Sequence, residues 1–188
     1  DEDGDTLTYS ITGSDITINS STGVIAFASA PDYETKSSYT ATVTASDGTN
    51  STTQAITVNV TNVNDVAPAF TSSATFSAAE NQTAIETVTA TDVDGDNITF
   101  TVSGSELAIT SAGVLTFASA PNYETKSTYT ATVTATDGTN STTQAITVNV
   151  TDVNDNSPVF TSSATFNGYD DTKIIYISSR SYSEAVKT

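Results

Sequence analysis

Cysteine, histidine, methionine and tryptophan do not occur in this sequence. Without cysteine there is no disulfide framework, and without cysteine and histidine the usual ligands of zinc and haem iron are missing. The lack of cysteine does not assign a compartment, because exported proteins also occur without disulfides. No apolar run is long enough for a transmembrane helix, and the chain opens on "DEDGDTL" rather than on a signal peptide. We expect it to continue a longer protein.

Positive charge is also scarce. Five Lys and Arg oppose 22 Asp and Glu, which leaves a formal net charge of −17. Nucleic acid and anionic membrane surfaces repel such a chain, so the composition favours cations as partners, or saline surroundings. The abundant residues indicate strands, because Thr stands beside Val, Ile, Tyr and Phe, which suit a pleated, half-buried surface.

The sequence contains an internal duplication. Residues 27–65 and 117–155 align without a gap and differ at four of 39 positions, which are Asp32/Asn122, Ser38/Thr128, Ser46/Thr136 and Asn62/Asp152. The heptapeptide "FTSSATF" occurs at 70–76 and again at 160–166. A fixed period indicates an array of similar domains. We predict a first repeat over residues 1–65, truncated at its N-terminus, a complete second repeat over 66–155, and over 156–188 either the start of a third repeat or a divergent tail.

Within the second repeat, apolar and polar residues alternate with a period of two. Tyr129, Ala131 and Val133 alternate with threonines, which predicts a strand. The pair Asp137-Gly138 is typical of a hairpin turn into the next strand, and residues 69–76 are expected to form the first strand. About seven short strands per repeat, with no helical stretch, predict an all-β fold of tandem seven-stranded antiparallel Greek-key sandwiches, immunoglobulin-like in kind.

Acidic residues gather where the predicted strands end. Asp92 and Asp94 follow one strand, Asp137 closes another, and Asp152 and Asp155 follow the last. Carboxylates held close together repel one another unless a cation joins them. Ca²⁺ typically takes about six to eight oxygen ligands from Asp, Glu, Asn and backbone carbonyls. A calcium site at the ends of the sandwiches is therefore predicted.

The order of these motifs resembles that of tandem cadherin repeats, in the form found in large bacterial surface proteins. The linker pattern D-x-N-D-N-x-P is complete at residues 152–158 and partial at 62–68. The D-x-D motif stands at 92–94, A-x-D at 135–137, and the counterpart of D-R-E is Asp32-Tyr33-Glu34. A single such motif is weak, because it can also be an Asx turn that binds no ion. Several of them, in order and repeated at one spacing, are specific.

The resemblance implies that the linker supplies calcium ligands shared by neighbouring repeats. At the first junction, Asp32, Glu34, Asn62, Asn64 and Asp65 would meet Asp92, Asp94 and Asp137, with the carbonyls of Val63 and Val66 adding oxygens. At the far end of the second repeat the expected ligands are Glu80, Glu124, Asp152, Asn154, Asp155 and Asn156. At the far end of the first repeat they are Asp1, Asp3 and Asp47. Asn62 and Asn122 replace aspartates of the pattern, which predicts weaker or fewer ions.

The function implied by the resemblance is a calcium-binding adhesion or extender module at a cell surface or outside the cell. Calcium would stiffen the array, and the partners would be the adjacent repeats and cell-surface proteins or glycans, with homophilic adhesion included. Adhesion by an exchanged tryptophan is excluded, because the chain has no tryptophan. The alternative is a calcium-dependent carbohydrate-binding module, since tyrosines stack on sugars, although Tyr39 and Tyr129 recur at the repeat period as structural residues do. We expect no enzyme and no nucleic-acid partner.

Overall fold

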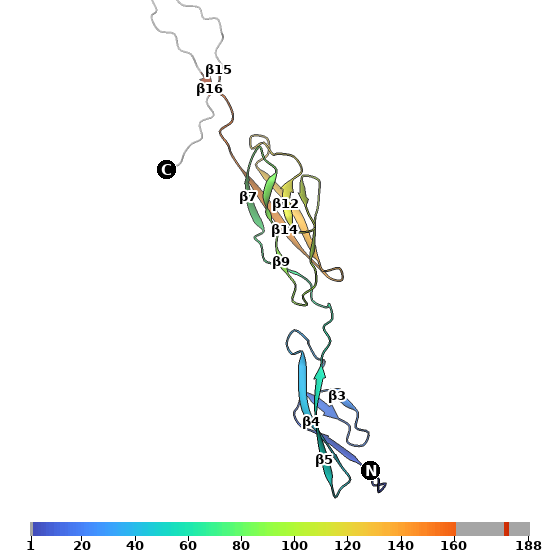
Figure 1. The fold of residues 1–188 in the computed structure, drawn as a ribbon. Helices are drawn as coiled ribbons and strands as arrows, with labels where there is room; N and C mark the ends of the chain where they lie inside the picture. Colours follow the sequence, from blue (N-terminus) through green and yellow to red (C-terminus); the bar gives the residue numbers. More distant parts are fainter. Residues whose placement is uncertain (1, 161–178, 181–188) are drawn as a thin grey trace, which may run out of the picture.

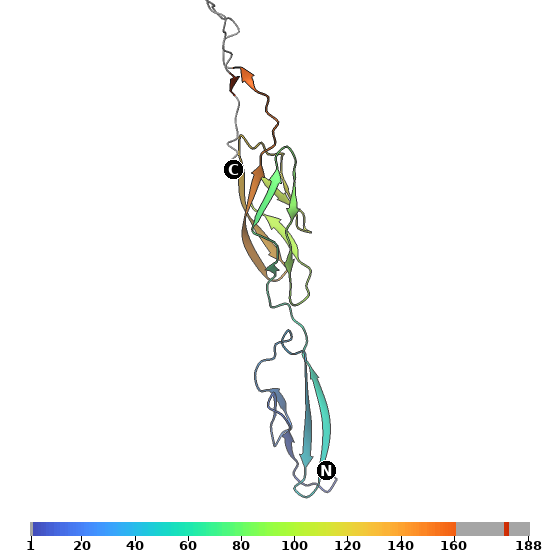
Figure 2. The ribbon, with the colours of Figure 1, turned by 90° about the vertical axis from the view of Figure 1, so that its left-hand side faces the viewer.

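A computed structural model describes residues 2–160 and 179–180 of the chain. Every regular element in these ranges is a strand, so the predicted all-β class is confirmed. Figures 1 and 2 show two β-sandwich bodies that follow each other end to end along the chain. Across the described ranges there is no helix with the length and hydropathy needed to cross a membrane. Most of the predicted third repeat or tail, at residues 161–178 and 181–188, lies outside the described part.

The second repeat has the larger set of strands. They are β6 (Ala69–Phe70), β7 (Thr75–Ala79), β8 (Ala84–Thr87), β9 (Ala90–Thr91), β10 (Thr99–Val102), β11 (Leu107–Ile109), β12 (Val114–Phe117), β13 (Thr128–Thr136) and β14 (Ser141–Thr151). One sheet has the order β10-β13-β14-β7, a second has the order β11-β12-β8, and β6 pairs with β9. The long β13–β14 hairpin turns at the predicted Asp137-Gly138, where Gly138 has a φ of 98° that favours glycine.

The first repeat has fewer strands. They are β1 (Thr8–Ile11), β2 (Ile16–Ile18), β3 (Ile25–Phe27), β4 (Ser38–Ser46) and β5 (Ser51–Asn59). They form a sheet of order β1-β4-β5 and a β2-β3 hairpin. Beyond the second repeat, β15 (Val159–Phe160) pairs with β16 (Ser179–Arg180).

The core of the second repeat follows from the alternation in the sequence. Inward-facing Val133 and Ala135 of β13 and Ile146 and Val148 of β14 are buried, while the threonines between them point outward. Burying an aliphatic side chain of this size contributes about 1.5–3 kcal/mol, so this sheet anchors the sandwich. Tyr129 packs edge-on against a phenylalanine of β12 at 5.0 Å between ring centroids, which assigns this tyrosine to the core rather than to a sugar-binding surface.

The expectation of one strand over residues 69–76 is wrong. The segment is split into β6, which pairs with β9, and β7, which pairs with β14. Its middle forms other bonds, because Thr71 N–H donates to the carbonyl of Thr89 at 2.9 Å and the Ser73 hydroxyl accepts from Thr75 N–H at 3.0 Å. The β7–β14 pairing is also parallel, whereas every other strand pair in the described ranges is antiparallel as predicted.

Candidate metal centre

The linker between the repeats is fastened to a single aspartate of the second repeat. Asp94 lies in the loop between β9 and β10 and is 9% exposed. Its Oδ2 accepts hydrogen bonds from the N–H groups of Asp65 at 3.1 Å and Val66 at 2.9 Å. The Asn62 amide donates to the Asp94 carbonyl at 2.8 Å. The residues before β6 are thereby held against the tip of the second sandwich.

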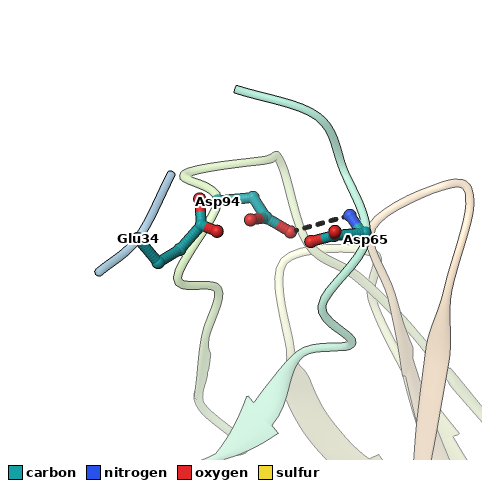
Figure 3. A group of neighbouring side chains, drawn as sticks. All are labelled: Glu34, Asp65 and Asp94. Carbon is teal, nitrogen blue, oxygen red and sulfur yellow. Dashed lines mark hydrogen bonds between the residues drawn. The ribbon is translucent and has the colours of Figure 1, made fainter. Parts of the chain in front are cut away.

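Three carboxylates from different segments converge at this junction. Figure 3 shows Glu34, from the loop before β4 of the first repeat, facing Asp94 together with Asp65 of the linker. One oxygen from each lies within 4.8 Å of the others. The first repeat, the linker and the second repeat therefore each contribute an acid to one small volume.

The β9–β10 loop holds a second acidic group. Asp92, Asp94 and Asp96 also place one oxygen each within 4.8 Å of one another. Asp96 was not among the predicted ligands, although the spacing of "DVDGD" extends the D-x-D motif by one more aspartate. Asp94 belongs to both groups and lies between them.

The hairpin loop of the second repeat reaches the same junction. Asp137 Oδ1 accepts hydrogen bonds from the N–H groups of Thr139 at 2.7 Å and Asn140 at 2.6 Å. The Asn140 amide in turn donates to Asn64 Oδ1 at 2.8 Å. Sequence reasoning missed Asn140, because no motif distinguishes it from the rest of the hairpin turn. The predicted Asn64 and Asp137 thus lie in one hydrogen-bond network.

Three carboxylate oxygens at this junction have no hydrogen-bond partner. They are Asp92 Oδ2, Asp94 Oδ1 and Asp137 Oδ2, and all three are shielded from solvent. A buried charged oxygen without a partner is costly unless a cation or a donor compensates it. The two lysines within the described ranges pair elsewhere, Lys36 with Asp15 and Lys126 with Glu106. The donor set of hard, anionic oxygens fits Ca²⁺.

The pKa values of two acids at the junction are shifted in opposite directions. Desolvation raises the pKa of Glu34, and the neighbouring charge of Asp94 raises it further. Burial also acts to raise the pKa of Asp137, but the hydrogen bonds donated by Asn140 and Thr139 outweigh it, so this pKa lies below its usual range. Asp137 is therefore held ionised, while Glu34 retains its proton more readily until a cation approaches.

Asp32 is not brought into the acidic groups. Its carboxylate accepts hydrogen bonds from Glu34 N–H at 3.0 Å and from the N–H and hydroxyl of Thr35 at 3.1 Å and 2.8 Å. The bonds from Thr35 lower the pKa of Asp32. Asp32 thus shapes the turn that presents Glu34.

At the far end of the first repeat, the structure describes two of the three predicted ligands, Asp3 and Asp47. Asp47 caps its own hairpin loop by accepting from the N–H groups of Thr49 and Asn50 at 2.7 Å and 2.6 Å. Asp3 is exposed, and Asp1 lies outside the described residues.

The far end of the second repeat carries another acidic group. Glu80 is 2% exposed, and its carboxylate accepts hydrogen bonds from the N–H groups of Tyr123 and Val153, both at 2.8 Å. Oxygens of Glu80, Glu124 and Asp152 lie within 4.8 Å of one another.

Three further predicted ligands follow this group along the chain. Asp155 Oδ2 accepts from the Asn81 amide at 2.6 Å, and the Asn156 amide donates to Glu124 Oε1 at 2.9 Å. Asn154 is exposed. Asp155 and Asn156 therefore lie beside the acidic group, in contact with the loops that form it.

The fold and this junction define a chain of immunoglobulin-like β-sandwich repeats joined through acidic linkers. A family model described as a bacterial Ig domain matches residues 64–151. Human Protocadherin-15 is 33% identical in an alignment of 181 residues that covers 87% of this chain. Mouse Cadherin EGF LAG seven-pass G-type receptor 2 is 36% identical in an alignment of 173 residues that covers 82% of this chain. The chain spans only 9% and 6% of the length of these two relatives.

Solved structures agree with the curated relatives. The Protocadherin gammaB7 EC3-6 cis-dimer structure matches 82% of this chain and 44% of its own chain, with a TM-score of 0.71 and 27% identity. Mouse Cadherin-23 EC22-24 matches 84% of this chain and 57% of its own, with a TM-score of 0.69 and 26% identity. The chain consists of cadherin-like repeats, as the resemblance in its motifs predicted.

Proposed function

We propose that this chain is a calcium-binding module of a surface or extracellular protein, in which Ca²⁺ at the junction of the repeats stiffens the array. The observation that carries the proposal is the set of buried, unpartnered oxygens on Asp92, Asp94 and Asp137. They lie where the linker meets the second repeat, and the Glu34–Asp65–Asp94 group adds an acid from the first repeat. Binding one cation here would join both repeats.

The residues at the junction determine how many oxygens could coordinate Ca²⁺ and how strongly they would bind it. Bound Ca²⁺ would supply positive charge and draw oxygens from both repeats to one centre. Asp94 would ligate through its free Oδ1 while Oδ2 keeps the linker N–H groups. Asn62 donates through its amide where Asp152 contributes a carboxylate to the other group. We therefore expect modest affinity, about 10⁻⁴–10⁻³ M or weaker, as in extracellular modules.

Stiffening follows from the charge at the junction. Without a cation, the like charges of Glu34, Asp65 and Asp94 repel, and they push the first repeat away from the second. With Ca²⁺ the same groups attract a common centre, so the angle between the sandwiches becomes fixed. A rod built this way holds a binding region away from the surface that carries it, which suits an extender in an adhesive protein.

Calcium titration by calorimetry tests the site, and small-angle scattering tests the stiffening. Asp94→Ala and Asp65→Ala should each weaken calcium binding, and Asp94→Ala should also leave the scattering profile insensitive to calcium. Asp15→Asn is the control, because it removes one acid that pairs with Lys36 away from the junction. Wild-type protein with no calcium-dependent heat and no change in dimensions or flexibility would refute the proposal.

The adhesive role of the parent protein is part of the same proposal. It is supported by the similarity to cadherin-family relatives, of which this chain spans a small part. The partners we propose are adjacent repeats and cell-surface proteins or glycans, at an extracellular location. Beads coated with the chain should aggregate with Ca²⁺ and not with EDTA if adhesion is homophilic. Beads that stay dispersed in both conditions would assign the chain to an extender alone.

A further inference from the structure

The two long hairpins, β4–β5 and β13–β14, are nearly identical in sequence and register. Strands β4 and β13 differ only at their first and last positions, Ser38/Thr128 and Ser46/Thr136. Strands β5 and β14 both begin with "STTQAITVN". Each hairpin is built from nine cross-strand pairs in the same antiparallel register. One hairpin therefore presents the same side chains at the same places as the other.

The strands that pair with the two hairpins also match. Strand β4 pairs with β1, and β13 pairs with β10, through four positions in each case. Thr44 lies opposite Ser10 in the first repeat, as Thr134 lies opposite Thr101 in the second. The receiving strands read "TYSI" and "TFTV", so hydroxyl-bearing and larger apolar or aromatic side chains alternate in the same phase. The edge that receives one hairpin is therefore suited to the other.

Each hairpin makes the same aromatic contact outside its own sheet. Tyr39 packs against Phe27 with 5.0 Å between ring centroids and 66° between ring planes. Tyr129 packs against Phe117 at the same 5.0 Å and at 68°. The buried aliphatic residues of the second hairpin have identical counterparts in the first, which are Val43, Ile56 and Val58 for Val133, Ile146 and Val148. The core of the second repeat thus has no residue contact that distinguishes its own hairpin from that of the first repeat.

We propose that the β4–β5 hairpin of one copy takes the place of the β13–β14 hairpin in a second copy, whose own hairpin fills the place left in the first. In the second repeat the incoming hairpin would lie between β10 and β7, where β13 and β14 lie in one chain. The partner is therefore another copy of this chain, and the surface it fits is the interior of the sandwich. Exchange of an identical element is a low-cost route to a dimer.

The connections before the two hairpins are long enough for this exchange. Residues 28–37 precede β4 and residues 118–127 precede β13, which is ten residues in each case. Ten extended residues span about 33 Å, whereas the two sheets of a sandwich lie about 10 Å apart. Either hairpin can therefore reach a sandwich that lies alongside its own.

Bonds at both ends of the second hairpin oppose exchange once the repeat has folded. The Glu80 carboxylate, 2% exposed, accepts from Tyr123 N–H before β13 and from Val153 N–H after β14, both at 2.8 Å. Lys126, also before β13, pairs with Glu106. All of these bonds must break before the hairpin leaves. Exchange therefore belongs to folding, when hairpins form from local contacts and the places that receive them are still empty.

Concentration decides which hairpin fills each place. Within one chain a short connection gives the native hairpin an effective concentration on the order of millimolar. A hairpin from another copy competes only as the concentration of the protein rises, because its packing is the same and its tether is absent. The exchanged dimer should therefore increase with protein concentration during refolding, and it needs no calcium.

Cysteine cross-linking tests the exchange, because the chain has no cysteine of its own. One copy carries Thr44→Cys and the other carries Thr101→Cys. In the exchanged dimer these positions lie opposite each other, as Thr134 and Thr101 do in one chain. The two variants are unfolded together, refolded in EDTA and oxidised mildly, and mass spectrometry identifies the linked peptides. A disulfide between the two copies should form, and its yield should rise with protein concentration.

Two controls separate exchange from chance collision of cysteines. Variants that are folded separately and then mixed should form little of this disulfide, because their hairpins are already in place. Thr99→Cys in place of Thr101→Cys is displaced by two residues from the register and should lower the yield. Absence of the disulfide after joint refolding, or equal yields from jointly and separately folded copies, would overturn the proposal.

A charge in the hairpin tests whether it enters the core. Val43→Asp in the copy with Thr44→Cys would bring a carboxylate to the place of Val133, which is 0% exposed, so the disulfide should be lost. Ala55→Asp is the matched control, because Ala145 at the equivalent place in β14 is exposed, and its disulfide should persist. A disulfide that survives Val43→Asp, or one that Ala55→Asp abolishes equally, would contradict packing of the hairpin in the second sandwich.

Discussion

At the scale of single residues, Asp94 has two oxygens with different roles. Oδ2 accepts two N–H groups of the linker, and Oδ1 is buried with no partner. The first oxygen orders the linker whether or not an ion is bound, while the second is a cost that only a cation offsets. One oxygen of Asp94 thus holds the linker in the absence of an ion, and the other is available to bind the ion.

Asp94→Asn should separate these two roles. The asparagine oxygen can still accept from Asp65 and Val66, so the melting temperature in EDTA should stay the same or rise as an uncompensated charge is removed. The increase in melting temperature that Ca²⁺ gives to the wild type should be lost. Thermal denaturation with EDTA and with Ca²⁺ checks this, beside Asp15→Asn as control. A large loss of stability in EDTA would contradict it.

Asn62 is the residue through which the first linker departs from the second. Asn62→Asp removes the bond that its amide donates to the Asp94 carbonyl, which should cost about 1 kcal/mol in EDTA. The added carboxylate should tighten calcium binding at the first junction, as measured by calorimetry. Asn122→Asp is the control, because it adds the same charge at the turn before Glu124, beyond the first junction. Unchanged or weaker calcium affinity in Asn62→Asp would count against a site at this place.

At the scale of elements, a close approach between strands fixes the position of one glycine. Gly113 has a φ of 89°, and a Cβ there would lie 2.3 Å from the Val88 carbonyl oxygen and 3.3 Å from the Phe100 ring. Its counterpart Gly23 also has a positive φ, of 70°, but the nearest atoms are 3.4 Å away, on the Tyr9 ring. Val88 lies between β8 and β9, and this segment has no equivalent in the described part of the first repeat.

Gly113→Ala should therefore destabilise the second repeat more than Gly23→Ala destabilises the first. Both variants incur the cost of a positive φ, about 1–2 kcal/mol. Only Gly113→Ala also forces backbone atoms apart. Chemical denaturation of the two variants, followed separately by hydrogen exchange in β4 and β13, measures the difference. Equal losses would mean that the contact with Val88 relaxes without cost.

At the scale of the whole molecule, the excess of acids makes calcium more than a local ligand. A net charge of −17 is distributed over end-to-end sandwiches, so the repeats repel each other over distances that salt can screen. Screening weakens the repulsion but bridges nothing. Monovalent salt should therefore only weaken the repulsion between the repeats, whereas calcium should also join them.

Distances between the repeats can be measured directly, because the sequence has no cysteine to interfere with labelling. Dyes on cysteines introduced at the exposed Thr22 and Ser105 would report on the two sandwiches. Ca²⁺ should narrow the distribution of distances, while sodium chloride in EDTA should shift its mean and leave it broad. A distribution that sodium chloride alone narrows would contradict bridging by a divalent ion.

Much of the fold followed from local pattern, and the exceptions have physical causes. The alternation along β13 and β14 predicted their strands and their buried residues, because side-chain direction in a strand has a period of two. The same reasoning treated residues 69–76 as one strand. It could not detect that Thr71 N–H bonds to the Thr89 carbonyl and Thr75 N–H to the Ser73 hydroxyl. These bonds divide the segment between two sheets.

The sequence by itself determined the β class, the repeat and the presence of acids at the strand ends, since these depend on residues close together along the chain. Only the tertiary structure decided which acids meet. Asp32 and Glu34 are two residues apart, yet Asp32 caps its own turn while Glu34 faces Asp94 across the junction. Convergence depends on how distant segments are placed, which the local sequence does not encode.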